Sequence, residues 1–234
     1  MTNLEEENKI LKRKLSHAQQ WMKKEISTRE MNIASQIEEQ IYAFFPVESL
    51  SHFPAYGLEN IVSSEIIFRH IIDGENLDGM GVIIGYQKVI DDMVELYITK
   101  GFRKYAQKHS SISSPINTPL EKSLHSVVHK KYILSLGRIY GLLKDIASWK
   151  KLNPYTQLFS DYLKSRLFLQ KALLGTQFLL QLELLIRLHA VTDKRHSWTL
   201  SKKDTIEARS TIIWNFTDTN CILYILAASQ NVDI

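Results

Sequence analysis

The stretch QLELLIRLHAVTDKRHSWTLSKKDTIEAR, residues 181–209, decides the fold expected for this chain. An apolar helical pattern ends there in a polar turn, and a second helix begins directly afterwards. Ser201 followed by Asp204 resembles a capping box, the usual signal for a helix start. The turn between the two helices gathers cationic and ionisable side chains, namely Arg187, His189, Lys194, Arg195 and His196. The stretch therefore predicts two packed helices joined at a positively charged turn.

The rest of the chain carries the same helical pattern. Thr118-Pro119-Leu120-Glu121 predicts a helix start, with Thr118 as N-cap and Glu121 at the third helical position. Further helices are predicted by apolar spacing at 58–72, about 82–108, around 133–143, 155–166, 167–187, 206–216 and 221–228. The 167–187 helix is apolar nearly all round, which predicts a place at the centre of a bundle. No strand alternation or hairpin signal occurs, so the expected fold is an all-α helical bundle.

The first residues predict a separate arm, residues 1–45. Apolar residues fit a heptad repeat in which Leu4, Leu11 and Ala18 occupy d positions and Asn8, Leu15 and Met22 occupy a positions. An Asn among apolar a residues is a device that fixes the register of a dimeric coiled coil. The alternative is a single charged helix lying on the body of the same chain. Two prolines and Gly57 in residues 46–57 predict a loop between this arm and the main body, residues 58–234.

Composition narrows the class of protein. The chain has 234 residues, is 44% hydrophobic and carries a formal net charge of +4, which permits contact with nucleic acid or an acidic partner. Cys221 is the only cysteine and lies in an apolar run, so we expect a core residue and neither a disulfide framework nor a cysteine zinc site. No apolar run approaches the roughly 18–20 residues of a membrane span, and the first residues resemble no secretory signal. We therefore expect a cytoplasmic protein without a membrane partner.

Two other sequence patterns give weaker evidence for a functional site. His125 and His129 have the four-residue spacing at which two histidines on a helix can hold a metal, but no third ligand is evident. Gly79, Gly81 and Gly85 follow no strand and precede no Walker lysine, so they do not predict a nucleotide site. No metal and no other cofactor is expected.

The basic turn allows one kind of chemistry. Histidine can move a proton, and arginine can stabilise the charge of a phosphorane, so His196 with Arg187 or Arg195 could form a metal-independent ribonuclease. The alternative is a set of solvated cations that complement the dipole at a helix C-terminus.

The same residues resemble the C-terminal half of HEPN domains, helical bundles of RNA-cleaving toxins and defence proteins. The course HSWTLSKKDTIEAR after the turn is similar to the family, and so are the early helices at SSEIIFRHIIDGENLDGMGVIIGYQKVIDDMVELYITKGFRKY. The resemblance spans about 58–228 and implies a long helical insertion near 109–165. The family signature is Arg, often followed by Asn or His, then four to six residues and His. Neither His196 nor the pair Arg195-His196 completes that spacing, so the resemblance implies a degenerate site.

HEPN-like domains commonly pair through their signature helices, which would bring two copies of the basic turn together. We therefore expect a homodimeric, non-catalytic binding module that acts on RNA or with a larger protein partner, in the setting of bacterial defence or stress response. The alternatives are the ribonuclease described above and a structural adaptor. For an adaptor, RNA binding should be absent, and deletion of residues 1–28 should abolish complex formation.

Overall fold

The computed structural model describes residues 28–74, 77–109, 116–130, 132–148, 152–192, 200–213 and 216–230, without the side chains of 188–192. Within these ranges every regular element is a helix and none is a strand, which confirms the predicted all-α helical bundle. In chain order the helices are residues 28–44, α2 (Val47–Leu50), α3 (Gly57–Ile72), α4 (Met80–Met93), the π-helical η1 (Val94–Thr99), α5 (Lys100–His109), α6 (Pro119–Lys130), α7 (Leu136–Ala147), α8 (Pro154–Lys164), α9 (Leu167–Leu173), α10 (Thr176–Thr192), α11 (Lys202–Ile213) and α12 (Ile222–Ala228).

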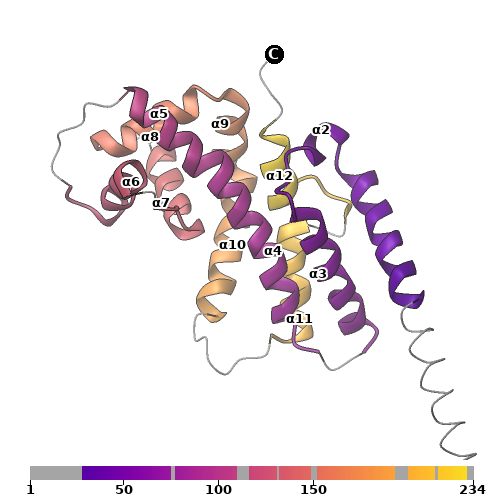
Figure 1. Ribbon diagram of the computed structural model, residues 1–234. Coiled ribbons are helices and arrows are strands. Elements are labelled where there is room, and N and C mark those ends of the chain that lie inside the picture. The colour runs from indigo at the N-terminus through magenta and orange to yellow at the C-terminus, as the bar shows by residue number, and fades with distance from the viewer. Residues whose placement is uncertain are drawn as a thin grey trace, which may run out of the picture.

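Two groups of helices pack against one long, continuous helical element. Figure 1 shows α4, η1 and α5 running through the molecule as a continuous element, with α3 and α11 packed along its α4 end. Helices α6, α7 and α8 gather around its α5 end, and α10 and α12 lie between the two groups. The C-terminal end of α10, the start of α11 and the turn between α3 and α4 all lie at the same end of the bundle.

The buried apolar side chains form one continuous core cluster. Its largest fully buried members include Tyr86, Phe102, Phe159 and Phe178, which come from both groups of helices. Cys221 is also buried, and this burial raises the pKa of its thiol to about 12, as expected for a core residue. None of the helices in the described ranges is long and apolar enough to cross a bilayer.

Both predicted helix starts are confirmed by their hydrogen bonds. At α6, the Thr118 hydroxyl accepts from the Glu121 backbone N–H at 3.2 Å, and the Glu121 carboxylate accepts from the Thr118 N–H at 2.7 Å. At α11, the Ser201 hydroxyl accepts from the Asp204 N–H at 3.1 Å and donates to its carboxylate at 2.6 Å. Each cap satisfies backbone groups that the first helical turn leaves unpaired.

The single helix predicted at 167–187 is wrong. The chain instead forms α9 and α10, which are separated at Leu174 and Gly175, where glycine has a low intrinsic helix propensity. The α10 part lies between the two groups of helices, but it is not enclosed on all sides, because Leu180 is 52% exposed and Leu184 is 41% exposed. Apolar character on every face of α10 therefore reflects an apolar surface stripe as well as core packing.

The described part of the N-terminal arm lies against the bundle. Residues 28–44 run antiparallel to α3, with Arg29 paired to Asp73 at 3.6 Å near one end of the two helices. Ile37, Ile41 and Phe45 are buried in the common core. The heptad positions Leu4, Asn8, Leu11, Leu15, Ala18 and Met22 lie outside the described residues.

Candidate functional site

Arg187 lies in the last part of α10, which ends at Thr192, and faces solvent. Its side chain is 71% exposed, and its guanidinium contacts the Glu183 carboxylate, one turn earlier on the same helix, at 2.5 Å. Hydrogen bonds from the Tyr140 hydroxyl and from Arg187 lower the pKa of Glu183, so this carboxylate stays charged and holds Arg187 along the helix. Exposed ion pairs are weak because water and salt screen both charges, so a phosphate can compete with Glu183 for Arg187.

The other predicted site residues are only partly placed. His189 belongs to α10, two residues beyond Arg187, and Lys194, Arg195 and His196 lie outside the described residues. Two cations that were not among the predicted site residues, Lys202 and Lys203, are exposed in the first turn of α11. We call the region from Arg187 to Lys203 the α10–α11 corner.

Hydrogen bonds connect the α11 side of this corner to the turn between α3 and α4. The Asp78 carboxylate accepts hydrogen bonds from the backbone N–H of Leu200 at 2.8 Å and of Met80 at 3.0 Å. The Lys202 ammonium donates to the carbonyl of Ile72, at the end of α3, at 2.9 Å. Asp78 thus joins the start of α4 to the residues just before α11.

Close backbone packing adds to these hydrogen bonds. A Cβ placed on Gly79 would lie 1.7 Å from the Thr205 hydroxyl oxygen, a distance that no side chain can adopt. Only glycine therefore permits this approach of the α3–α4 turn to α11. A Cβ on Gly85 would likewise lie 2.1 Å from the Ser64 hydroxyl oxygen, so Gly79 and Gly85 serve helix packing, whereas a Cβ on Gly81 would meet only an ordinary contact at 3.5 Å.

A buried polar network fixes α11 from inside the bundle. Arg209 of α11 donates from Nε and Nη2 to the two carboxylate oxygens of Glu65 on α3, at 2.6 and 2.7 Å. The Tyr86 hydroxyl of α4 donates to the same carboxylate. The Arg209 guanidinium also lies 4.3 Å from the centre of the Phe68 ring, a cation–π distance.

This network has a structural role, because its polar groups are buried and not accessible to solvent. Arg209 and Glu65 have side chains only 5% and 3% exposed, and Tyr86 is fully buried. Burial and the Glu65 charge raise the pKa of the Tyr86 hydroxyl well above its ordinary value. Burial alone would lower the pKa of Arg209, but its hydrogen bonds and ion pair with Glu65 raise it overall. Arg209 is therefore cationic and Tyr86 neutral, and together with Glu65 they hold α3, α4 and α11 in one arrangement.

The histidine pair occupies a separate place, on α6. The rings of His125 and His129 lie 4.4 Å apart, and Tyr155 of α8 contacts the His125 ring edge-on. In the part of the chain that the structure describes, no group of three metal-binding side chains occurs.

The described part of the corner thus carries exposed cations on both α10 and α11. We found no family model, curated protein or solved structure that matches this chain.

Proposed function

We propose that the chain is a non-catalytic, HEPN-like binding module that pairs with a second copy and binds the phosphates of RNA at the α10–α11 corner, within a larger complex. The exposed Arg187 supports this proposal most directly, because it places an accessible cation at the predicted corner. Lys202 and Lys203 add exposed positive charge at the start of α11. The bidentate geometry of arginine suits a phosphate once Glu183 is displaced.

Binding fits the corner better than cutting does. A ribonuclease needs an arginine free to stabilise the transition state and a histidine at a fixed spacing from it. The sequence offers neither Arg-to-His spacing of the family signature. This departure favours a module that has kept the cations and lost the reaction.

Dimer formation is supported by the surface of α10. Leu180, Leu184 and Arg187 are spaced four and three residues apart, so they share one face of the helix, and all three are exposed. An apolar stripe beside a cation suits a contact between two copies of α10, which would join two corners into one basic groove.

RNA binding is tested with fluorescence anisotropy on a labelled single-stranded RNA. We expect Arg187→Glu combined with Lys202→Glu and Lys203→Glu to weaken binding at least about tenfold and to flatten its salt dependence, which scales with the number of phosphate contacts. Lys164→Gln is the control, because Lys164 forms a similar exposed pair with Asp161, 3.1 Å away on α8. Equal RNA affinity of the triple variant and the control would refute the proposed site.

Catalysis is tested on the same RNA in the presence of a chelator. We expect no cleavage by the wild-type protein and no change with His196→Ala. Cleavage that His196→Ala abolishes, with fold and oligomeric state intact, would instead establish the ribonuclease. Absence of any RNA binding, together with loss of complex formation on deletion of residues 1–28, would establish the adaptor.

The dimer is tested by light scattering after size exclusion. Leu180→Asp with Leu184→Asp should yield monomers, whereas Leu167→Asp, on the exposed face of α9, should leave the dimer unchanged. A dimer that survives the α10 variant and is lost on deletion of residues 1–27 would assign pairing to the predicted coiled coil.

A further inference from the structure

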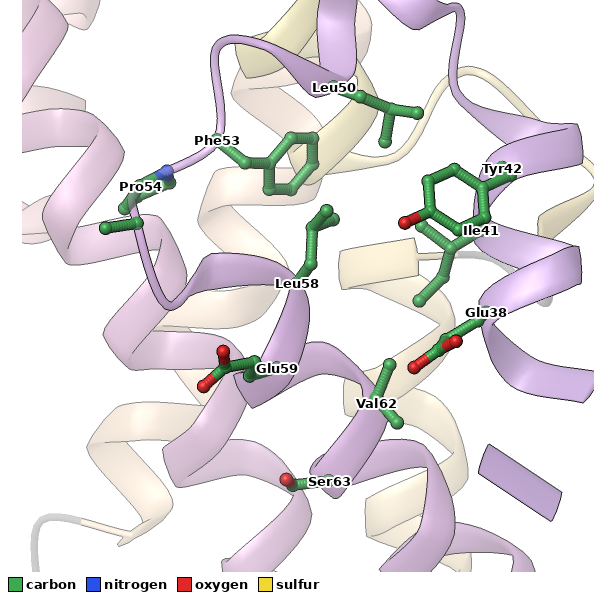
Figure 2. A pocket seen from close by; sticks show the side chains of 11 residues that line it. Glu38, Ile41, Tyr42, Leu50, Phe53, Pro54, Leu58, Glu59, Val62 and Ser63 are labelled. Atoms are coloured by element: carbon green, nitrogen blue, oxygen red, sulfur yellow. The ribbon is translucent and has the colours of Figure 1, made fainter. Parts of the chain in front are cut away.

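A cavity lies far from the α10–α11 corner, where residues 28–44 pass α2 and the start of α3. Its volume is about 590 Å³, within the range of pockets that hold small organic ligands. Its wall is mainly apolar and includes the side chains of Ile41, Phe53, Leu58 and Val62. Figure 2 shows Leu58 and Val62 between the two sides of this wall, with Phe53 at one end.

Among the described residues, the charged groups that line the cavity are all of one sign. Glu38 lines it from residues 28–44 and Glu59 lines it from α3, and no lysine, arginine or histidine of the described ranges is among the lining residues. In the view of Figure 2 the two carboxylates lie on either side of Leu58 and Val62, and the Tyr42 hydroxyl points inward between the helices. This composition contrasts with a chain whose formal net charge is +4.

The nearest cations of the helix pair are occupied elsewhere. Arg69 of α3 donates to the side-chain amides of Gln36 and Gln40, at 3.0 and 3.2 Å. Arg29 pairs with Asp73 at 3.6 Å. Arg29 therefore pairs at the far end of the two helices, and Arg69, whose partners flank Glu38 in the sequence, donates to neutral amides and not to the Glu38 or Glu59 carboxylate.

Glu59 has a local role that Glu38 lacks. It stands in the first turn of α3, where a carboxylate complements the helix dipole. Glu38 lies in the middle of residues 28–44, so no helix terminus explains its charge at the cavity. A carboxylate there lowers the affinity for an anion and favours a cation.

We propose that this cavity binds a small organic cation with an apolar body, such as an aryl or alkyl ammonium compound. The apolar body lies on Phe53, Leu58 and Val62, and the ammonium group lies against the Glu38 carboxylate, while Glu59 adds a second negative charge on the other side of Leu58 and Val62. The Tyr42 hydroxyl provides a further oxygen acceptor. The charge of the lining excludes nucleotides and other phosphates from this site, so its ligand differs from that of the α10–α11 corner.

The test compares three probes that share one body and differ in the head group: 4-phenylbutylammonium, 4-phenylbutanol and 4-phenylbutyrate. Binding to the full-length protein is measured by calorimetry at neutral pH. We expect the ammonium compound to bind most tightly, the alcohol more weakly and the carboxylate weakest of all. Equal affinity for the ammonium and carboxylate probes, or no saturable binding of the ammonium probe, would overturn the proposal.

Two double variants locate the binding. Glu38→Gln with Glu59→Gln should weaken the ammonium probe by about tenfold, because it removes the exposed carboxylate that the ammonium contacts and the second negative charge of the lining. Glu39→Gln with Glu48→Gln changes the net charge of the protein equally, but neither residue lines the cavity, so affinity should stay at the wild-type value. Identical loss in both variants would show a general charge effect and exclude this site. Thermal unfolding of both proteins checks that the fold is retained.

Discussion

At the scale of single residues, the buried Arg209–Glu65 pair joins α11 to α3 through two hydrogen bonds. Its two hydrogen bonds of 2.6 and 2.7 Å are formed where water cannot replace a lost partner. We expect Arg209→Met to destabilise the protein by about 3–5 kcal/mol, because it leaves the Glu65 carboxylate buried and without its cation.

Urea unfolding measures this cost against a surface pair. Arg187→Met breaks an arginine–glutamate pair on an exposed helix face and should cost at most about 1 kcal/mol. A similar loss in both variants would mean that the buried pair does not hold α11 in place.

The histidine pair predicts a pH effect at the same scale. Burial of its ring and the nearby charges of His129 and Lys130 lower the pKa of His125 below 6.5. Protonation therefore disfavours the folded form, so the stability linked to His125 is complete above pH 6.5 and is lost as the pH falls. We expect His129→Asn to raise the pKa of His125, measured by NMR titration, and His52→Asn to leave it unchanged. An unaltered pKa in His129→Asn would show that the two rings do not interact electrostatically.

At the scale of elements, sequence patterns predict the contacts that are local. The caps at Thr118 and Ser201 are confirmed because all their partners lie within three residues. The Arg209–Glu65 pair spans 144 positions, so no local pattern predicts it. The break at Gly175 was missed because an all-round apolar pattern is equally compatible with one helix and with two.

Helix approach at Gly85 is another contact that only the fold reveals. A Cβ on Gly85 would lie 2.1 Å from the Ser64 hydroxyl oxygen and 3.3 Å from the Asn60 carbonyl oxygen, so α3 and α4 pack at a distance that excludes a methyl group. We expect Gly85→Ala to destabilise the protein by about 1–3 kcal/mol through this overpacking.

A double-mutant cycle assigns the cause. Ser64→Ala removes the closest atom, so it should recover much of the loss in the Gly85→Ala background, which denaturant titration measures. Gly137→Ala is the matched control, because a Cβ there meets nothing within 4 Å, and removing a helical glycine should stabilise the protein by about 0.4–1 kcal/mol. Purely additive losses from Gly85→Ala and Ser64→Ala would show that the two side chains do not collide.

At the scale of the whole molecule, the remaining question is where the bundle begins. Loop signals predict a boundary at 46–57, but Ile37, Ile41 and Phe45 are buried in the same core as α3 and α12. Phe45 also lies 5.8 Å from the Tyr224 ring in a stacked arrangement. The four-residue spacing of Ile37 and Ile41 is typical of one helical face, but spacing alone does not identify the surface that this face covers.

Two truncations separate an independent arm from an integral helix. Deletion of residues 1–27 should leave thermal unfolding cooperative, because the core contacts of the described chain begin beyond it. Deletion of residues 1–45 also removes three buried side chains, each worth about 2–5 kcal/mol in a packed core. That sum is comparable to the whole stability of an ordinary domain, about 5–15 kcal/mol. The longer deletion should therefore lose cooperative unfolding by circular dichroism and aggregate in light scattering. A cooperative transition at the wild-type temperature would instead show that residues 1–45 form a separate arm and that the bundle is complete without them.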